Sequence, residues 1–283
     1  MVEKILKYHP DLPDYQGCDG YKSGDPNEEC KGIAVALVPT YEVIQKMIQK
    51  GCNLLITHEP AFYQSPDYPE WKGNFFNKVY EEKAKLLQEN HITIWRDHDH
   101  IHSHKPDGIF TGVLKYLGWE KYYKPELGGE FGCYFVELPE TTVGELGEYL
   151  KEKLKLNGLR YMGRKEDKIS RVAIVGHLYP NCFYPDKVDK EGFYHDYSMK
   201  LMEQMEKEHG IEAIIPGEII EWTILSYIRD AITMGKTKAC FNIGHFNMEE
   251  LGMRYAKDWI SELVEHKLPV HYIPTEDGFS YLN

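Results

Sequence analysis

The sequence has no pair of cysteines at the spacing of a zinc ribbon or a redox motif. Its six cysteines are scattered over the chain without a CxxC pair: Cys18, Cys30, Cys52, Cys133, Cys182 and Cys240. Cys52 and Cys240 fall inside apolar runs, where a free cysteine behaves as a small apolar side chain. We therefore expect reduced, structural cysteines and a cytoplasmic protein, because disulfides are rare in that compartment.

Long apolar runs and excess positive charge are absent as well. No stretch approaches the roughly 18 apolar residues of a membrane span, and Met1-Val2-Glu3-Lys4 does not resemble the start of a secretory leader. The 33 Lys and Arg residues are outnumbered by 45 Asp and Glu residues, which gives a net charge of −12. This balance argues against nucleic acid as the main partner. A small phosphorylated substrate remains compatible, because a bound metal ion reverses the local field.

The pattern of apolar residues predicts an α/β fold with mainly parallel sheets. In the first half, strand-like runs at 32–38, 52–57 and 92–95 alternate with amphipathic helices at 41–50 and 76–90. In the second half, strands are predicted near 133–138, 159–162, 170–175, 211–215 and 239–243, and helices near 141–154, 198–209, 222–234 and 246–266.

The chain of 283 residues is long enough for two such halves. We place their boundary so that residues 1–122 form an N-terminal α/β half and residues 123–283 a C-terminal half that contributes His245 and Glu249, although the halves can also pack as one unit. Residues 10–31 and the aromatic stretch at 179–194 are predicted to be loops, the second long enough to be functional.

A dense histidine cluster follows the third strand. His98-Asp99-His100-Ile101-His102-Ser103-His104 brings together four imidazoles and a carboxylate. If this segment is extended, all four imidazoles share one face and Asp99 lies opposite. Since metal ligands need orienting neighbours, we expect at least one of these histidines to play a supporting role.

Two other strand-like runs also end at potential metal ligands. One leads into His58-Glu59-Pro60, and the other leads into Gly244-His245, with Glu249 one helical turn later. The HxxxE spacing alone is common on solvated helix faces, and the first pair could simply cap its strand. Because sites form at the carboxyl ends of parallel strands, the three stretches together predict a metal site. Histidine and carboxylate ligands suit zinc, iron or manganese.

Two further residues are weaker candidates. Glu218 follows Pro216-Gly217 at the end of another strand and could act as a general base or support a ligand, although a surface glutamate is the simpler interpretation. His177 ends the strand at 170–175 and could face the same site.

These stretches together resemble the NIF-three-like dinuclear metal-centre family, whose members are known as GTP cyclohydrolase 1 type 2 homologues. That family has a strand running into T-H-H-P, a second running into H-x-x-L-D, and G-H-x-x-x-E at the start of a late helix. The corresponding stretches here are Thr57-His58-Glu59-Pro60, His98 to His102, and Gly244-His245 to Glu249. The resemblance implies two α/β halves facing a shared metal cleft, two divalent ions and a homohexamer.

The sequence departs from the family pattern at two positions. Glu59 replaces the second histidine of T-H-H-P, and His102 falls where relatives have a bridging aspartate. By resemblance the metal ligands are His58, Glu59, His102, His245 and Glu249. The bridging role would then pass to Glu249 or Glu59, because a neutral imidazole does not bridge two ions as a carboxylate does.

The leading hypothesis is a divalent-metal-dependent hydrolase or cyclohydrolase that uses a metal-activated water. Glu218 or His98 would relay the proton. A nucleotide or other phosphorylated heterocycle as substrate follows from the resemblance alone. The main alternative is a metal-binding or metal-delivery protein without turnover. A third interpretation, suggested by the pair His98 and His100, is a metallophosphoesterase of another lineage.

Overall fold

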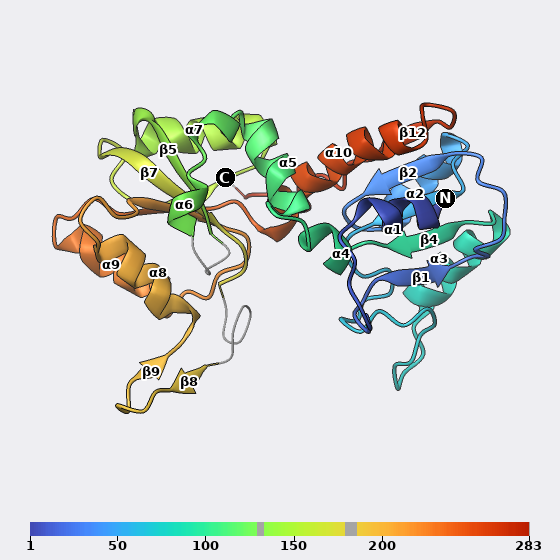
Figure 1. Cartoon of the computed structure of the whole chain (residues 1–283), viewed down its shortest axis with the longest axis horizontal. Coiled ribbons are helices and arrows are strands. Elements are labelled where there is room, and N and C mark those ends of the chain that lie inside the picture. The colour runs from blue at the N-terminus through green and yellow to red at the C-terminus, as the bar shows by residue number, and fades with distance from the viewer. Residues whose placement is uncertain (129–132, 179–185, 283) are drawn as a thin grey trace. The chain divides into compact units, whose positions relative to one another are not determined.

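The computed structural model describes residues 1–128, 133–178 and 186–282. Contacts between Cα atoms divide the chain into two compact units (Figure 1). The first unit contains residues 1–113 and 249–276, and the second contains residues 114–248 and 277–283. The N-terminal stretch of the first unit thus ends at residue 113, before the expected boundary at 122 and 123, and residues 249–276 join this unit because most of the late helix packs into its core.

The first unit is built on a five-stranded sheet in the order β1-β4-β3-β2-β12. Its strands are β1 (Gly20–Ser23), β2 (Ile33–Ala36), β3 (Leu54–Thr57), β4 (Thr93–Arg96) and β12 (Val270–Tyr272). The four strands from β4 to β12 are parallel, and β1 joins the edge antiparallel to β4. The carboxyl ends of β3 and β4 therefore lie side by side at the same edge of the sheet.

Helices cover both faces of this sheet. They are α1 (Val2–Tyr8), α2 (Tyr41–Gln49), α3 (Lys78–Glu89), the short α4 (Asp99–His102), α5 (Gly108–Leu117) and α10 (His245–Leu263). Alternate strand residues point to opposite faces: Ile33 and Val35 pack with α1 and α10, whereas Ala34 and Ala36 pack with α2 and α3. The strands are buried on both sides, which explains their continuous apolar sequence.

Two glycines allow α5 and α10 to approach closely. A Cβ atom on Gly112 would lie 2.7 Å from the Cα atom of Gly252, and one on Gly252 would lie 2.7 Å from the Cα atom of Ile109. Only glycine fits such a crossing without displacing a helix. The crossing fixes the first-unit part of α10, which carries Glu249.

The second unit contains a sheet in the order β5-β7-β10-β11-β6. Its strands are β5 (Cys133–Thr142), β6 (Arg160–Met162), β7 (Lys168–Val175), β10 (Ala213–Pro216) and β11 (Ala239–Asn242). Strands β7, β10 and β11 are parallel, and the two edge strands are antiparallel to their neighbours. The remaining elements are η1 (Glu120–Tyr122), α6 (Pro125–Gly128), α7 (Val143–Leu154), β8 (Lys187–Val188), β9 (Tyr194–His195), α8 (Tyr197–Glu206) and α9 (Ile224–Thr233).

The predicted α/β class with mainly parallel sheets is confirmed, and most predicted elements are present within a few residues of their expected ends. The expected loop at 10–31 contains the edge strand β1, and β12 was not predicted. In the predicted loop at 179–194, residues 179–185 lie outside the described residues, and the remainder contains β8 and β9. Within the described ranges, no helix combines the length and apolar character needed to cross a bilayer.

A buried lysine lies between α3 and the loop that follows β3. Lys83 is 2% exposed, and its Nζ atom donates a hydrogen bond to the carbonyl oxygen of Ala61 at 2.5 Å. The ammonium group also lies over the rings of Phe62 and Tyr63. Burial lowers the pKa of Lys83 from 10.5 to about 8, although the charge of Asp67 opposes the shift. The folded protein therefore binds the Lys83 proton less tightly than the unfolded chain does.

We predict that Lys83→Met removes a pH dependence of stability. Between about pH 8 and pH 10 the unfolded chain keeps the Lys83 proton while the native state loses it, so the free energy of unfolding should rise with pH by on the order of 1 kcal/mol per unit. The difference between wild type and variant, measured by urea unfolding at several pH values, isolates this contribution. Lys85→Met, on an exposed part of the same helix, should leave the slope unchanged, and an equal slope in wild type and Lys83→Met would contradict the assignment.

Candidate metal centre

His58 stands directly after β3 and is fully buried. Its Nδ1 atom lies 3.0 Å from the backbone carbonyl oxygen of Asp97, which can only accept a hydrogen bond. The Nδ1 atom must therefore carry the proton, and the lone pair of the neutral ring is at Nε2. Among the described residues Nε2 has no hydrogen-bond partner, and it lies 3.3 Å from the Oε2 atom of Glu249. A neighbour on one nitrogen that orients the other is the usual arrangement of a metal-binding histidine.

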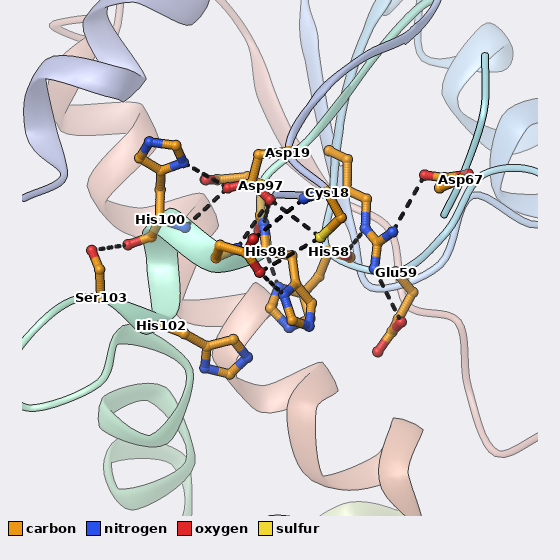
Figure 2. A network of polar contacts seen from close by, with 12 residues as sticks. Cys18, Asp19, His58, Glu59, Asp67, Asp97, His98, His100, His102 and Ser103 are labelled. Atoms are coloured by element: carbon orange, nitrogen blue, oxygen red, sulfur yellow. Dashed lines mark hydrogen bonds and ion pairs between the residues drawn. The ribbon is translucent and has the colours of Figure 1, made fainter. Parts of the chain in front are cut away.

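The histidine cluster after β4 is helical rather than extended. Residues Asp99–His102 form α4, so the expectation that four imidazoles share one face is wrong. On a helical turn, residues four positions apart share a face. His98 and His102 accordingly lie together beside His58, whereas the His100 ring lies on another side of the turn, next to Asp19 (Figure 2).

Asp19 holds this turn in place. The pairing of Gly20 with Arg96, between β1 and β4, brings Asp19 to the start of α4. There its Oδ1 atom accepts hydrogen bonds from the backbone N–H groups of His98 (2.7 Å) and Asp99 (3.0 Å), and its Oδ2 atom accepts one from His100 (2.9 Å). Burial alone would raise the pKa of Asp19, but these bonds and one from the His100 ring outweigh it and lower the pKa. A charged carboxylate at this position is a strong helix cap.

His98 and His102 are each anchored by a carboxylate. The Nδ1 atom of His98 lies 2.7 Å from Asp99, and that of His102 lies 2.6 Å from Asp107. With Nδ1 donating in both rings, the Nε2 atoms are the available donors of electron pairs. The ring of His58 stacks on His98 at 4.4 Å and meets His102 edge-on at 4.9 Å. One nitrogen of each ring lies within 4.8 Å of the others.

Two glutamates complete the group in the first unit. Glu59 and Glu249 are 8% and 2% exposed, and one oxygen of each lies within 4.8 Å of a His58 nitrogen. The guanidinium of Arg96 lies behind Glu59, at 4.0 Å, and also donates a hydrogen bond to the His58 carbonyl oxygen and approaches Asp67 at 3.6 Å (Figure 2). Arg96 therefore balances the charge of two buried carboxylates next to the cluster.

The pKa values of the two anchored histidines, His98 and His102, are shifted in opposite directions. Burial lowers the pKa of His98, and its neighbours His58 and His102 add to this effect against the hydrogen bond to Asp99. Burial also disfavours the charged form of His102, but Asp107, Glu249 and Asp99 outweigh it and raise the pKa of His102 to about 8.

These residues fit a divalent ion. Three imidazoles with one nitrogen each within 4.8 Å of the others, and two buried carboxylates beside them, are unfavourable unless a cation or proton lies among them. Nitrogen and carboxylate donors are the set that zinc, iron and manganese accept. The described residues of the first unit thus contain a cluster that could bind metal, formed by His58, Glu59, His98, His102 and Glu249.

The other predicted residues belong to the second unit. The Nδ1 atom of His245 lies 3.6 Å from Oε1 of Glu218, whose side chain is about half exposed. The rings of His245 and His177 lie 4.1 Å apart, so these three residues do gather as the strand ends suggested. His245 is the first residue of α10 and Glu249 follows one turn later. Their joint role as ligands with His58 stays a prediction.

Several important residues were missed by the sequence analysis. Asp19 and Arg96 could not be found from periodicity or motif spacing, because their contacts join segments far apart in the sequence. Asp107 lies only five residues from His102 and could have been found as a carboxylate one turn beyond the cluster. Asp97 could have been identified from the sequence as a carboxylate directly after the strand β4.

Fold and cluster together define an α/β protein with a histidine and carboxylate cluster of the metal-centre type at the strand ends. The chain belongs to the Duf34/NIF3 (NGG1p interacting factor 3) family, whose model matches residues 5–176, more than half of the sequence. The family expected from the motifs is thereby confirmed.

Relatives and solved structures agree with this assignment. The chain is 28% identical over 236 residues to a GTP cyclohydrolase 1 type 2 homolog from Clostridium acetobutylicum. The matched region covers 81% of this chain and 76% of that protein. A protein of the same name from Clostridium perfringens is 27% identical over 81% of this chain and 78% of its own. The fold matches a Staphylococcus aureus hypothetical protein (TM-score 0.70, 19% identity, 99% and 98% of the two chains) and a Bacillus cereus protein related to NIF3 (TM-score 0.70, 16% identity, 99% and 98%).

We predict that Asp19→Asn weakens both the fold and metal binding. The amide would present N–H groups to donors that now find a carboxylate oxygen, which costs about 1–3 kcal/mol of unfolding free energy. Because α4 orients His98 and His102, divalent metal affinity should fall by roughly 10–100-fold. Asp11→Asn, an exposed change in the same loop, serves as the control. Reduced stability with unchanged metal affinity, measured by calorimetric titration, would show that the cap does not orient the histidines.

Proposed function

We propose that this protein is a divalent-metal-dependent hydrolase or cyclohydrolase whose metal centre is formed by His58, Glu59, His98, His102 and Glu249. The observation that supports it most directly is the way three histidines are anchored. Each has its Nδ1 atom held by an acceptor, namely a backbone carbonyl or a carboxylate, and one nitrogen of each ring lies within 4.8 Å of the others. Such agreement among three unrelated anchors is what a metal centre requires.

The ligands form two neighbouring sets that share His58. One consists of His58, His98 and His102, and the other of His58, Glu59 and Glu249. A single imidazole nitrogen binds one ion, so the second set needs a carboxylate to bridge or to supply another ligand if two ions are present. Glu249, whose Oε2 atom lies 3.3 Å from the Nε2 atom of His58, would supply that carboxylate. His245, one turn before Glu249, remains a predicted ligand on the sequence argument.

The residues themselves supply orientation and proton control. A bound divalent ion would lower the pKa of a water molecule toward about 7 and polarise the bond under attack. The guanidinium of Arg96 lies 4.0 Å from the carboxylate of Glu59, and Asp107 accepts a hydrogen bond from the His102 ring and fixes its orientation. The sequence predicts a proton relay through His98 or Glu218. The anchored ring of His98, in the middle of the cluster, favours a ligand role for this residue. Glu218 is then the better candidate for a general base, paired with His245.

A nucleotide or related phosphorylated heterocycle is the proposed substrate class. The support is the name GTP cyclohydrolase 1 type 2 homolog shared by several relatives. The net charge of −12 is no obstacle, because metal ions provide the local positive charge that phosphate oxygens need. A metal-binding or delivery protein without turnover is the alternative that an activity screen would distinguish.

We predict that His58→Gln lowers divalent metal affinity by about 100-fold or more, since it removes the nitrogen common to both ligand sets. His98→Gln should reduce bound metal as well if His98 is a ligand, and should leave it unchanged if His98 only moves protons. His209→Gln, at an exposed position of the second unit, is the matched control. Metal content by elemental analysis after equilibrium dialysis decides these cases, and full metal loading of His58→Gln would refute the proposed centre.

We predict that Glu218→Gln leaves metal content intact and lowers turnover by roughly 10²-fold, as loss of a proton-transfer group does. The measurement is a screen of nucleotides and phosphoesters with zinc, iron(II) and manganese, followed by kinetics on any substrate found. Equal rates for wild type and Glu218→Gln would exclude this residue as the base. Absence of turnover for every substrate and metal would favour the metal-delivery function.

A further inference from the structure

A second polar cluster lies on the side of α4 that faces away from His58. It contains Asp19, Asp97 and His100, and we refer to these three residues as the Asp97 cluster. One ligand atom of each lies within 4.8 Å of the others. His100 belongs to the dense histidine segment, yet the metal centre described above does not use it. All three residues are in the first unit.

The side chain of Asp97 has one oxygen with a partner and one without. It is 1% exposed, and its Oδ2 atom lies 3.0 Å from the Nε2 atom of His9. Its Oδ1 atom is buried and has no hydrogen-bond partner among the described residues. An unsatisfied oxygen of a buried carboxylate is costly, by about 1–3 kcal/mol or more. This oxygen therefore indicates a ligand or proton that the protein atoms do not provide.

The neighbours of this oxygen do not supply the missing partner. Asp19 is a second carboxylate whose side chain is equally buried, and its oxygens accept hydrogen bonds from three backbone N–H groups. The ring of His100 directs its Nδ1 atom at Asp19, at 2.7 Å (Figure 2). Two buried carboxylates so close repel each other. With neutral histidines the cluster has a charge of −2, which one divalent cation would balance.

We propose that Asp19, Asp97 and His100 form a second cation site, separate from the His58 centre. Two carboxylates and one imidazole are a harder donor set than three imidazoles, and they favour manganese(II) over softer ions. The ring of His100 donates a hydrogen bond to the Oδ2 atom of Asp19 at 2.7 Å, and a bound cation would take the place of that proton. Water molecules would fill the remaining positions.

The surrounding residues orient these ligands. His9 binds the Oδ2 atom of Asp97 and is itself held by His104, whose Nε2 atom lies 2.8 Å from Nδ1 of His9. This leaves Oδ1 as the coordinating atom of Asp97. The ring of Tyr15 packs on that of His100 at 4.7 Å and limits its rotation. The histidines of the segment therefore divide by position, with His98 and His102 serving one site and His100 and His104 the other.

The test uses a background in which the first centre is disabled. The double variant His58→Gln/His102→Gln removes two of its ligands and substitutes none of the three residues of the Asp97 cluster. Titration with manganese(II), followed by the decrease of the free-ion electron paramagnetic resonance signal, should show about one ion bound per chain with Kd well below 1 mM. Adding Asp97→Asn or His100→Gln should raise that Kd at least about tenfold. Neither result depends on whether the protein is a hydrolase.

His209→Gln in the same background is the matched control, because His209 has an exposed side chain and lies in the second unit. Its manganese Kd should stay within about threefold of the parent, below the tenfold effect expected of ligand loss. Circular dichroism verifies that each variant is folded, and His100→Gln carries the test if Asp97→Asn is not. No manganese binding below about 1 mM in the double variant would overturn the proposal. Equal binding with and without the ligand changes would overturn it too, because the ion would then bind elsewhere.

Discussion

The hydrogen bonds of one carboxylate, that of Asp19, determine the geometry on which the candidate sites depend. A four-residue turn such as α4 has too few internal bonds to be stable by itself. Asp19 takes up three of its N-terminal N–H groups, and it also binds the His100 ring. The turn then presents His98 and His102 on one side and His100 on another. Without this cap, the turn that separates His98 and His102 from His100 would lose the hydrogen bonds that hold it.

Position in the sheet brings the remaining groups to the turn. The parallel strands β3 and β4 end at the same edge, which places His58 beside Asp97 and His98. The antiparallel edge strand β1 delivers Asp19, and the close crossing of α5 and α10 at two glycines fixes the segment that carries Glu249. Each element therefore contributes one part of the site, and regular sheet geometry aligns these parts before any ligand binds.

Much of this was accessible from the sequence, and the exceptions have a common cause. Continuous apolar runs identified the buried strands, and the residues that follow them, His58 among others, identified the cluster. The conformation of the histidine segment was mispredicted because its polar residues have no apolar period. Its deciding interaction comes from Asp19, about 80 residues away in the chain. Residues such as Arg96 and Asp19 act through contacts between segments far apart in the chain, and local sequence patterns do not indicate these contacts.

The anchor of His58 differs in kind from those of the other two histidines. His98 and His102 are oriented by carboxylate side chains that a single substitution can remove. His58 is oriented by a main-chain carbonyl, that of Asp97, which every amino acid at that position would supply. The direction of this ring is therefore encoded in the register of β3 against β4, where Thr57 pairs with Arg96. A substitution of Asp97 would therefore leave the acceptor of the His58 ring in place. Only a shift of β3 against β4 would change the orientation of this ring.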